Sequence, residues 1–327
     1  MSESTDHRWW LPLAAATSLD VGRPLALSHL GEPVVLWRDG DRPVAFTDRC
    51  PHRGAQLSLG CVREGTLECP YHGWRFDASG QCTRVPALPA FEPPRGHRVR
   101  TWQVQEAFGL LWVAPAGAAG IEPFAPPAPQ SLPELPQRRV LCGPFEVATS
   151  APRAVENFLD TAHFGLVHEG WLGSREHLEV PDYQVEPDAL GRPGVPHYRA
   201  WQPQASASAS GGAWVDYRYQ LLSPFSALLR KRAQGAMPAE AYALWTTPTG
   251  DESCRAWFTI FVDADTPDDP TLIEFQQRIF AQDRPIVESQ RPRRLPLRGD
   301  ELSCAADRLS AAYRRWLVSL DFNIGCC

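Results

Sequence analysis

Apolar and polar residues are arranged as short extended runs along the first third of the chain. Runs at 33–37, 44–46, 99–104 and 109–113 are separated by turn residues, a pattern typical of strands. The run at 99–104 alternates with a period of two, and the run at 109–113 is continuously apolar. This part of the sequence therefore predicts a small all-β domain.

A stretch crowded with Pro, Ala and Gly follows, a composition typical of an extended linker. We expect a first domain over 1–115, a linker over 116–137 and a second domain over 138–327. Within the second domain the pattern predicts a short helical segment near 152–168, strands from about 180 to 262, and two closing helices. The aromatic residues of these strands are expected mainly in the core.

The last helix, over about 301–320, is predicted to pack one apolar stripe against the sheet. That stripe consists of Leu302, Ala306, Leu309, Tyr313, Trp316, Leu317 and Leu320. The densest basic triplet, Arg230 to Arg232, is interpreted as a solvated loop. It contains Lys231, which is the only lysine in the chain, so most lysine-dependent chemistry is excluded unless Lys231 provides it.

Composition narrows the classes of protein. The net charge of −6 argues against nucleic-acid binding, which needs a clustered basic face. No run of eighteen apolar residues occurs and the N-terminal stretch is polar, so we expect a cytoplasmic protein without a membrane span or signal peptide. Nine cysteines in such a chain favour metal ligands and incidental thiols over a disulfide framework.

Two short segments combine cysteine with histidine: residues 50–55 read CPHRGA and residues 69–74 read CPYHGW. The four candidate ligands are Cys50, His52, Cys69 and His72. Zinc takes two Cys and two His around one ion, whereas a Rieske [2Fe–2S] cluster takes two thiolates on one iron and two imidazoles on the other. The proline after each Cys and the glycine behind each His predict rigid turns in which backbone N–H groups approach the cluster sulfurs. These flanks favour the cluster.

A second candidate centre combines Asp160, His163 and His168 in one segment. On a regular helix, positions five apart point about 140° away from each other, so the two imidazoles would diverge. Gly165 lies between them, and we expect it to mark a helix break or bulge that turns both rings inward. Asp160 precedes His163 by three residues, so we expect the two on the same helical face. Asn157 is expected one turn before Asp160.

These motifs resemble those of the Rieske non-haem iron oxygenases. Respiratory Rieske proteins carry one more cysteine in each loop, but Ala55 and Tyr71 stand there, so the loops look like those of ferredoxins and oxygenases. The D-x-x-H-x-x-x-x-H motif is similar to the family's mononuclear-iron motif, whose 2-His-1-carboxylate triad leaves open positions on Fe(II). The resemblance implies that Asp283 is the carboxylate ligand. Glu288 is the alternative ligand. A separate alternative is that Asp283 has no ligand role and merely starts a helix turn before Pro285.

The resemblance also implies that Asp160 bridges, by hydrogen bonds, a cluster histidine of a neighbouring subunit and an iron-ligand histidine. The alternative is a plain helix-surface aspartate. Asn157 would act beside the iron or as a weak ligand. The implied architecture is α+β, with an N-terminal all-β Rieske domain and a C-terminal helix-grip domain, a curved antiparallel sheet wrapped around helices. The implied assembly is a head-to-tail homotrimer.

The implied activity is that of a terminal oxygenase that uses O₂ and electrons from NAD(P)H. A separate ferredoxin or flavin reductase would deliver the electrons, because the chain has no G-x-G-x-x-G fingerprint. Chain length and motif style look closest to the vanillate, dicamba and N-demethylase branch, which hydroxylates or O-/N-demethylates small aromatic substrates. A ring cis-dihydroxylating dioxygenase is the alternative within the class. A Rieske electron carrier without oxygenase activity is the alternative outside it.

Overall fold

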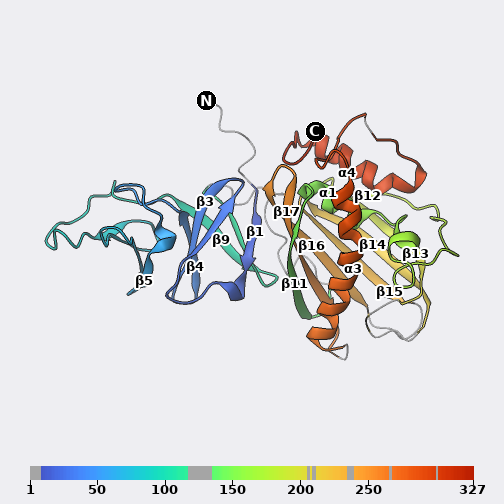
Figure 1. The fold of residues 1–327 in the computed structure, drawn as a ribbon, viewed down its shortest axis with the longest axis horizontal. Coiled ribbons are helices and arrows are strands. Elements are labelled where there is room, and N and C mark those ends of the chain that lie inside the picture. The colour runs from blue at the N-terminus through green and yellow to red at the C-terminus, as the bar shows by residue number, and fades with distance from the viewer. Residues whose placement is uncertain are drawn as a thin grey trace. The chain divides into compact units, whose positions relative to one another are not determined.

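The structure is a computed structural model, and two compact units divide the chain, 1–128 and 129–327 (Figure 1). The described residues are 9–116, 135–204, 207, 211–233, 239–264, 267–299 and 301–327. Most of the expected linker, 116–137, lies outside these ranges, so its extended conformation stays a prediction. No helix in the described ranges is long and apolar enough to span a membrane.

The N-terminal unit consists of two antiparallel sheets, as the extended runs predict. The larger sheet has the strand order β1-β10-β9-β4-β3-β2 and the smaller one the order β5-β6-β7-β8. The larger sheet is formed by β1 (Leu11–Ala15), β2 (Leu25–His29), β3 (Glu32–Asp39), β4 (Arg42–Thr47), β9 (Thr101–Ala107) and β10 (Leu110–Pro115). The smaller sheet is formed by β5 (Cys61–Arg63), β6 (Thr66–Glu68), β7 (Arg75–Phe76) and β8 (Cys82–Arg84). Two 3₁₀ turns, η2 (Ala16–Ser18) and η3 (Leu57–Leu59), complete the unit.

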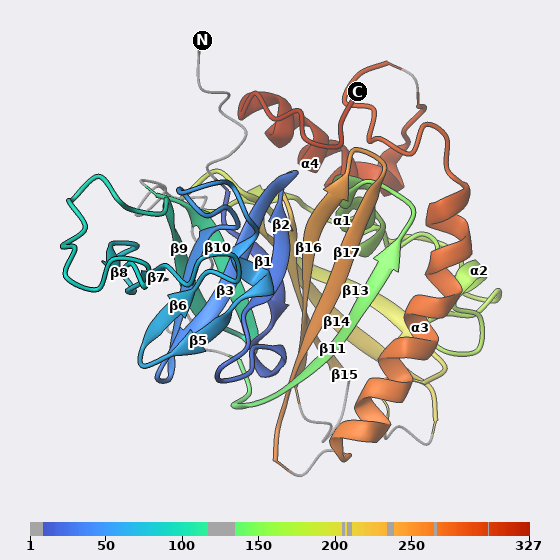
Figure 2. The ribbon, with the colours of Figure 1, turned by 60° about the vertical axis from the view of Figure 1, so that its left-hand side comes forward.

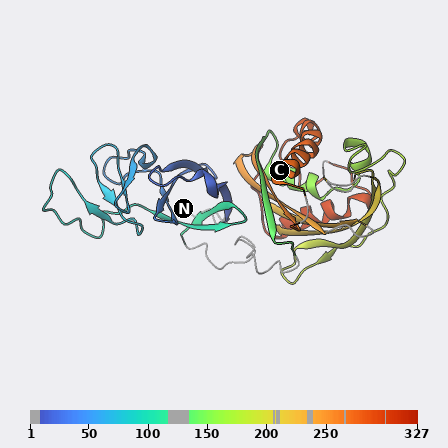
Figure 3. The ribbon, with the colours of Figure 1, turned by 90° about the horizontal axis from the view of Figure 1, so that it is seen from below.

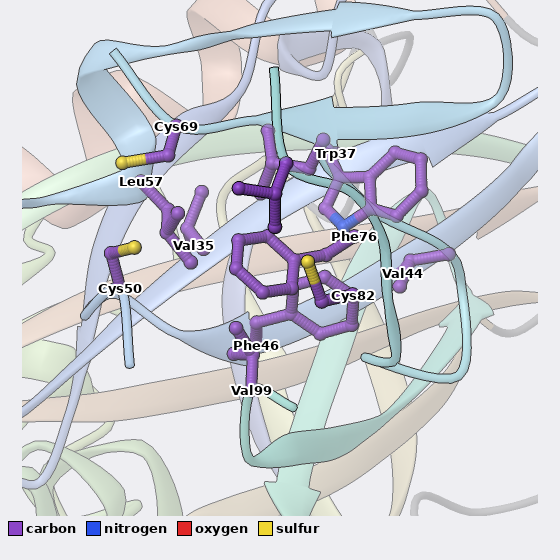
Figure 4. Packing of buried hydrophobic residues seen from close by; sticks show 12 residues of the cluster. Val35, Trp37, Val44, Phe46, Cys50, Leu57, Cys69, Phe76, Cys82 and Val99 are labelled. Atoms are coloured by element: carbon purple, nitrogen blue, oxygen red, sulfur yellow. The ribbon is translucent and has the colours of Figure 1, made fainter. Parts of the chain in front are cut away.

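A buried apolar cluster joins the two sheets of this unit (Figure 4). Trp37 and Phe46 from the larger sheet meet edge to face, with their ring centroids 5.6 Å apart, and Phe76 from the smaller sheet packs in the same cluster. Cys50 and Cys69 also belong to it, each only 2% exposed. The loops that carry these two thiols are therefore anchored in the core of the unit rather than on its surface.

The C-terminal unit is one seven-stranded antiparallel sheet with a few helices, as expected for an α+β fold. Its strand order is β11-β17-β16-β15-β14-β13-β12. The strands are β11 (Arg138–Val147), β12 (Glu186–Pro187), β13 (Pro193–Gln202), β14 (Ala213–Ser223), β15 (Ser226–Ala233), β16 (Glu240–Gly250) and β17 (Ser253–Val262). Seen from below, the sheet curves around α3 (Asp269–Ser289) (Figure 3).

Two helices cover the curved sheet and begin with the capping residues that helices favour. In α1 (Ala151–Leu159) the Ser150 hydroxyl accepts a hydrogen bond from the backbone N–H of Arg153, and in α3 the Asp268 carboxylate accepts one from Thr271. Helix α1 packs on β15, β16 and β17, while α3 runs alongside β11 (Figure 2). The interior of the unit thus lies between the sheet and these helices.

Several sequence expectations for this unit are corrected by the structure. The segment near 152–168 is two helices, α1 and α2 (Phe164–Val167), separated by a non-helical stretch. Strand β11 was not predicted at all, although it pairs with β17 along its length. The triplet from Arg230 to Arg232 is not a loop but part of β15, and Lys231 is only 7% exposed.

The closing helix is shorter than predicted. A 3₁₀ turn, η5 (Ala305–Asp307), precedes α4 (Arg308–Ser319). Leu309, Tyr313, Trp316 and Leu317 are buried as expected, but Leu302 is fully exposed because it precedes both elements.

Four charged side chains link α1 to the last part of the chain. Arg314 of α4 makes two hydrogen bonds to the Glu156 carboxylate, at 2.6 and 2.8 Å, and one to Glu301 at 2.6 Å. Arg153, whose side chain is 1% exposed, donates to Glu301 at 2.6 and 3.3 Å. Paired carboxylates and guanidinium groups make burial of these charges tolerable, and removing one partner is costly.

We expect Arg314→Leu to lower the free energy of unfolding of the C-terminal unit by about 2–4 kcal/mol, because Glu156 and Glu301 lose one of their two cations. Urea denaturation measures this change. The matched control is Arg315→Leu on the exposed side of the same helix, for which we expect about 0.5 kcal/mol or less. Equal effects of the two substitutions would contradict the network's role.

Candidate metal centres and an adjoining cavity

The two Cys/His loops close on themselves with the same pair of backbone hydrogen bonds. In the first loop the Cys50 N–H donates to the Ala55 carbonyl at 2.7 Å, and the Gly54 N–H donates to the Cys50 carbonyl at 2.9 Å. In the second, Cys69 and Gly73 make the equivalent bonds, at 2.8 and 3.0 Å. Both glycines have positive φ, +75° and +69°, which glycine adopts without strain. The sequence prediction of two rigid turns is confirmed.

The histidines of these loops are exposed, whereas the cysteines are buried. His52 and His72 are exposed, with their ring centroids 4.6 Å apart, and His52 stacks on Trp74 at 4.6 Å. Burial and contact with Cys69 raise the pKa of the Cys50 thiol to about 11, while partial desolvation and the neighbouring His72 lower the pKa of His52. Two buried thiols and two exposed imidazoles are the types of donor that either a zinc ion or a mixed-ligand [2Fe–2S] cluster takes.

The second centre brings together three residues from two distant parts of the chain. His163 precedes α2, His168 follows it, and Asp283 lies in the second half of α3. The Nε2 atoms of the two histidines are 3.2 Å apart, and the Asp283 Oδ1 atom lies 3.4 Å from the first and 3.2 Å from the second. One ligand atom of each residue lies within 4.8 Å of the others.

The far side of each imidazole is held by a hydrogen-bond acceptor. The His163 Nδ1 atom lies 3.2 Å from Asp160 Oδ2, and the His168 Nδ1 atom lies 2.9 Å from Gln282 Oε1. Since both acceptors require a proton on Nδ1, the Nε2 lone pairs of both rings point to the common centre. The Asp283 Oδ1 atom is buried and has no hydrogen-bond partner within the described ranges. These residues fit a divalent metal ion bound by two imidazoles and one carboxylate.

The turn between α1 and α2 directs these side chains. Helix α1 ends at Leu159, and Asp160 has an extended conformation, with φ −78° and ψ 133°. The predicted break at Gly165 is therefore wrong, because the chain leaves the helix five residues earlier. Gly165 has another role: a Cβ atom there would lie 2.5 Å from Leu178 and 2.8 Å from the Ser174 carbonyl. The expected helical face shared by Asp160 and His163 is also wrong, although the two side chains are in contact through the turn.

Burial and hydrogen bonding act in opposite directions on Asp160. Burial raises the pKa of its carboxyl, but the hydrogen bonds from His163 and from the Ala162 and Thr161 N–H groups outweigh it and hold the pKa below its usual range. The Asp160 side chain keeps 33% of its exposure. An ionised and partly exposed carboxylate is thus fixed beside one histidine.

The structure separates the remaining candidates for this centre. Asn157 lines the cavity that adjoins the two histidines. Glu288 lies elsewhere, with its carboxylate accepting hydrogen bonds from the Ala148 N–H at 3.0 Å and from Arg284 at 2.9 Å. It is therefore not part of the group formed by His163, His168 and Asp283.

The adjoining cavity lies between α1, α3 and the inner face of the sheet. Most of its wall is apolar, formed by residues such as Phe158, Leu229, Leu244, Phe258, Ile279 and Phe280. Tyr217, Tyr219 and Lys231 of the sheet and Gln276 of α3 add polar groups. An apolar cavity with a few polar groups beside a candidate metal centre is the usual form of a small-molecule site.

Sequence reasoning missed Gln282, Lys231 and Tyr219 in this region. Gln282 is adjacent to the predicted ligand Asp283, but nothing in the sequence pairs it with His168. For Lys231 a signal was present: it lies two residues after Leu229 in β15, and side chains two residues apart on a strand lie on the same face. The flanking arginines obscured this pattern.

Comparison with known proteins decides between zinc and iron at these two centres. The Rieske [2Fe-2S] domain family matches residues 9–103, and the vanillate O-demethylase oxygenase C-terminal domain family matches residues 147–321. The sequence is 31% identical to the methylxanthine N1-demethylase NdmA of Pseudomonas putida over 320 residues, 96% of this chain and 89% of NdmA. The chain belongs to the Rieske non-haem iron oxygenases.

Further relatives agree with this assignment. This Rieske oxygenase is 30% identical to the methylxanthine N3-demethylase NdmB of Pseudomonas putida over 309 residues, 92% of this chain and 84% of NdmB. It resembles the solved structure of Pseudomonas putida NdmA with caffeine with a TM-score of 0.82 at 29% identity, covering 96% of this chain and 90% of that one. As a member of the family it uses a Rieske [2Fe–2S] cluster, a mononuclear non-haem iron and electrons from a separate reductase.

The hydrogen bond between His168 and Gln282 generates a prediction about the iron site. We expect Gln282→Leu to weaken iron binding about 10- to 100-fold, because His168 loses the acceptor that fixes its Nε2 lone pair toward the centre. Titration of iron-depleted protein measures the affinity. The control is Gln277→Leu, an exposed residue of the same helix, which should bind iron like the unchanged protein. Unchanged affinity in Gln282→Leu would rule out this role.

Proposed function

We propose that this chain is the terminal oxygenase of a system that removes a methyl group from nitrogen or oxygen of a small aromatic substrate. One observation carries the proposal: the group His163, His168 and Asp283 adjoins an apolar cavity with aromatic walls. The matched relatives NdmA and NdmB are named as methylxanthine demethylases, which supports demethylation. One oxygen atom of O₂ enters a C–H bond of the methyl group next to the heteroatom, and the other is reduced to water by two protons and two electrons from the reductase. The resulting hydroxymethyl group is released as formaldehyde, and its hydroxyl proton passes to the heteroatom.

In this proposal Cys50, His52, Cys69 and His72 hold the cluster. His163, His168 and Asp283 hold the iron, which supplies activation of O₂ beside the substrate when it is bound. Asp160 and Gln282 keep both imidazoles in the tautomer that binds metal, while Asn157 contributes to the cavity wall beside them. The apolar wall excludes water from the reacting methyl group.

We further propose a head-to-tail homotrimer in which electrons cross between subunits. Asp160 contacts His163 and keeps 33% of its side-chain exposure, which supports a contact with a cluster histidine of a neighbouring subunit. The exposed rings of His52 and His72 support this arrangement. A ferredoxin or flavin reductase linked to NAD(P)H would supply the electrons, which fits a cytoplasmic enzyme.

The direct test is turnover of a panel of methoxy- and N-methyl-aromatic compounds with a reconstituted reductase. We expect formaldehyde in amounts equal to the demethylated product. In Asp283→Ala we expect iron to fall from about three to about two per chain and product to disappear, while the visible spectrum of the cluster remains. The control is Glu274→Ala, which changes an exposed residue of the same helix. It should keep about three irons per chain and normal product formation. Diol products without formaldehyde would instead indicate ring dihydroxylation.

The proposed electron path has its own test. We expect Asp160→Asn to reduce turnover about 10- to 100-fold without loss of either iron centre. The amide keeps one acceptor oxygen for the His163 N–H bond, but it has neither the second acceptor oxygen nor the negative charge needed to bridge to a second imidazole. Stopped-flow reoxidation of the reduced cluster by O₂ in the presence of substrate should slow by the same factor. Asp251→Asn, in an exposed turn, serves as the control. Unchanged reoxidation would refute the path.

A further inference from the structure

Lys231 lies on the same face of the sheet as the tyrosines of the cavity. It is opposite Tyr217 on β14 and opposite Glu240 on β16, and Leu229 two residues earlier is opposite Tyr219 and Tyr242. Side chains two residues apart on a strand share a face, so these groups form one surface of the curved sheet. The cavity is lined by Tyr217, Tyr219, Lys231 and Tyr242. The only lysine of the chain thus belongs to the wall of the cavity.

The charge of Lys231 is balanced by a buried carboxylate. Its Nζ atom lies 3.3 Å from Glu240 Oε2, and the two side chains are 6% and 5% exposed. The Tyr242 hydroxyl donates to the same carboxylate at 2.9 Å, and its ring centroid lies 4.9 Å from the Lys231 Nζ atom. The Lys231 ammonium group, although paired with Glu240, can still donate an N–H hydrogen bond to a neutral acceptor. A second carboxylate beside the pair would add an uncompensated negative charge in a buried region.

Tyr219 provides a second and independent observation. Its side chain is 3% exposed, and its hydroxyl is buried without a hydrogen-bond partner among the residues that the structure describes. Buried hydroxyl groups are almost always paired, and an orphaned one in a cavity wall indicates a position where a ligand completes the bond. Because the surrounding wall is largely apolar, that partner would be held by few other polar contacts.

We propose that Tyr219 and Lys231 recognise an uncharged oxygen acceptor, such as an amide or lactam carbonyl, on the substrate. The proposal rests on the demethylase function above and specifies its substrate class as neutral aromatic compounds with a carbonyl group and a separate methyl group. The carbonyl accepts hydrogen bonds at the sheet, which orients the ring between sheet and helices. Glu240 already neutralises the positive charge of Lys231. An anionic substrate would therefore add an unpaired negative charge here, so the site prefers neutral substrates.

Three compounds of similar size separate the possibilities: 4-methoxybenzamide, 4-methoxybenzoate and 4-methylanisole. With the holoenzyme kept free of O₂, we expect 4-methoxybenzamide to bind about 10- to 100-fold more tightly than either of the others, measured by calorimetry. A polar site rejects an analogue that leaves its hydrogen-bonding groups unpaired. Tighter binding of the benzoate would show an anion site and overturn the proposal. Equal affinity for all three, including no measurable affinity, would overturn it as well.

Two variants test the residues themselves. Tyr219→Phe removes one hydroxyl, and Lys231→Met combined with Glu240→Gln removes the ion pair without leaving an unpaired buried charge. We expect each to reduce the preference for 4-methoxybenzamide over 4-methylanisole to within a few-fold of equality. Lys231→Arg should keep most of the preference, since the positive donor remains. Variants that melt earlier but keep the full preference would show a purely structural role and refute the proposal.

The binding measurement also separates this proposal from the demethylase function. Preferred binding of the benzamide without formaldehyde on admission of O₂ and reductant would leave the recognition intact and refute demethylation of this class. Formaldehyde from all three compounds at equal kcat/KM, with equal affinity, would keep the demethylase function and refute the recognition by Tyr219 and Lys231.

Discussion

The convergence of two imidazole Nε2 atoms on one buried carboxylate is the constraint on which the C-terminal unit depends. Two imidazole nitrogens and a carboxylate oxygen that all lie within 4.8 Å of one another repel each other unless a metal ion or a proton lies between them. The protein holds them in place from behind, with Asp160 and Gln282 as acceptors for the two Nδ1–H groups. The energy of metal binding then offsets the cost of this arrangement.

The surrounding fold follows from that constraint. The two histidines come from a short stretch after α1, and the carboxylate comes from a helix more than a hundred residues later, so α1 and α3 must be fixed relative to each other. Both helices pack on the same curved sheet, and the network of Arg153, Glu156, Glu301 and Arg314 attaches α1 to the end of the chain. The cavity is the space that remains between helices and sheet.

Local features could be predicted from the sequence, whereas long-range ones could not. The turns of the Cys/His loops could be predicted because each is formed within one short segment. A backbone hydrogen bond joins Gly54 to Cys50 in the first loop and Gly73 to Cys69 in the second. The position of Asp283 followed only from a family resemblance, since no pattern in the sequence links it to residues 163–168.

Other features were misjudged because neighbouring residues outweighed the local signal. The helix break falls at Asp160, where hydrogen bonds to the side chain compete with the helix, rather than at the glycine that sequence rules favour. Lys231 was assigned to a solvated loop because two arginines flank it, although strand alternation directs them to the other face. Burial of a lysine depends on a partner, here Glu240 on the next strand, that only the fold brings close.

Helix α3 carries a further consequence for how such an enzyme diversifies. Its residues Gln282 and Asp283 serve the metal centre, while Gln276, Ile279 and Phe280 of the same helix form the cavity wall. A change of side-chain size on this helix shifts its axis and so displaces the metal ligand together with the wall. Strands β14 to β16 carry none of the three clustered ligands. Amino-acid substitutions on these strands can therefore change the substrate range, in natural or directed evolution, with less risk to the metal centre than substitutions on the helix.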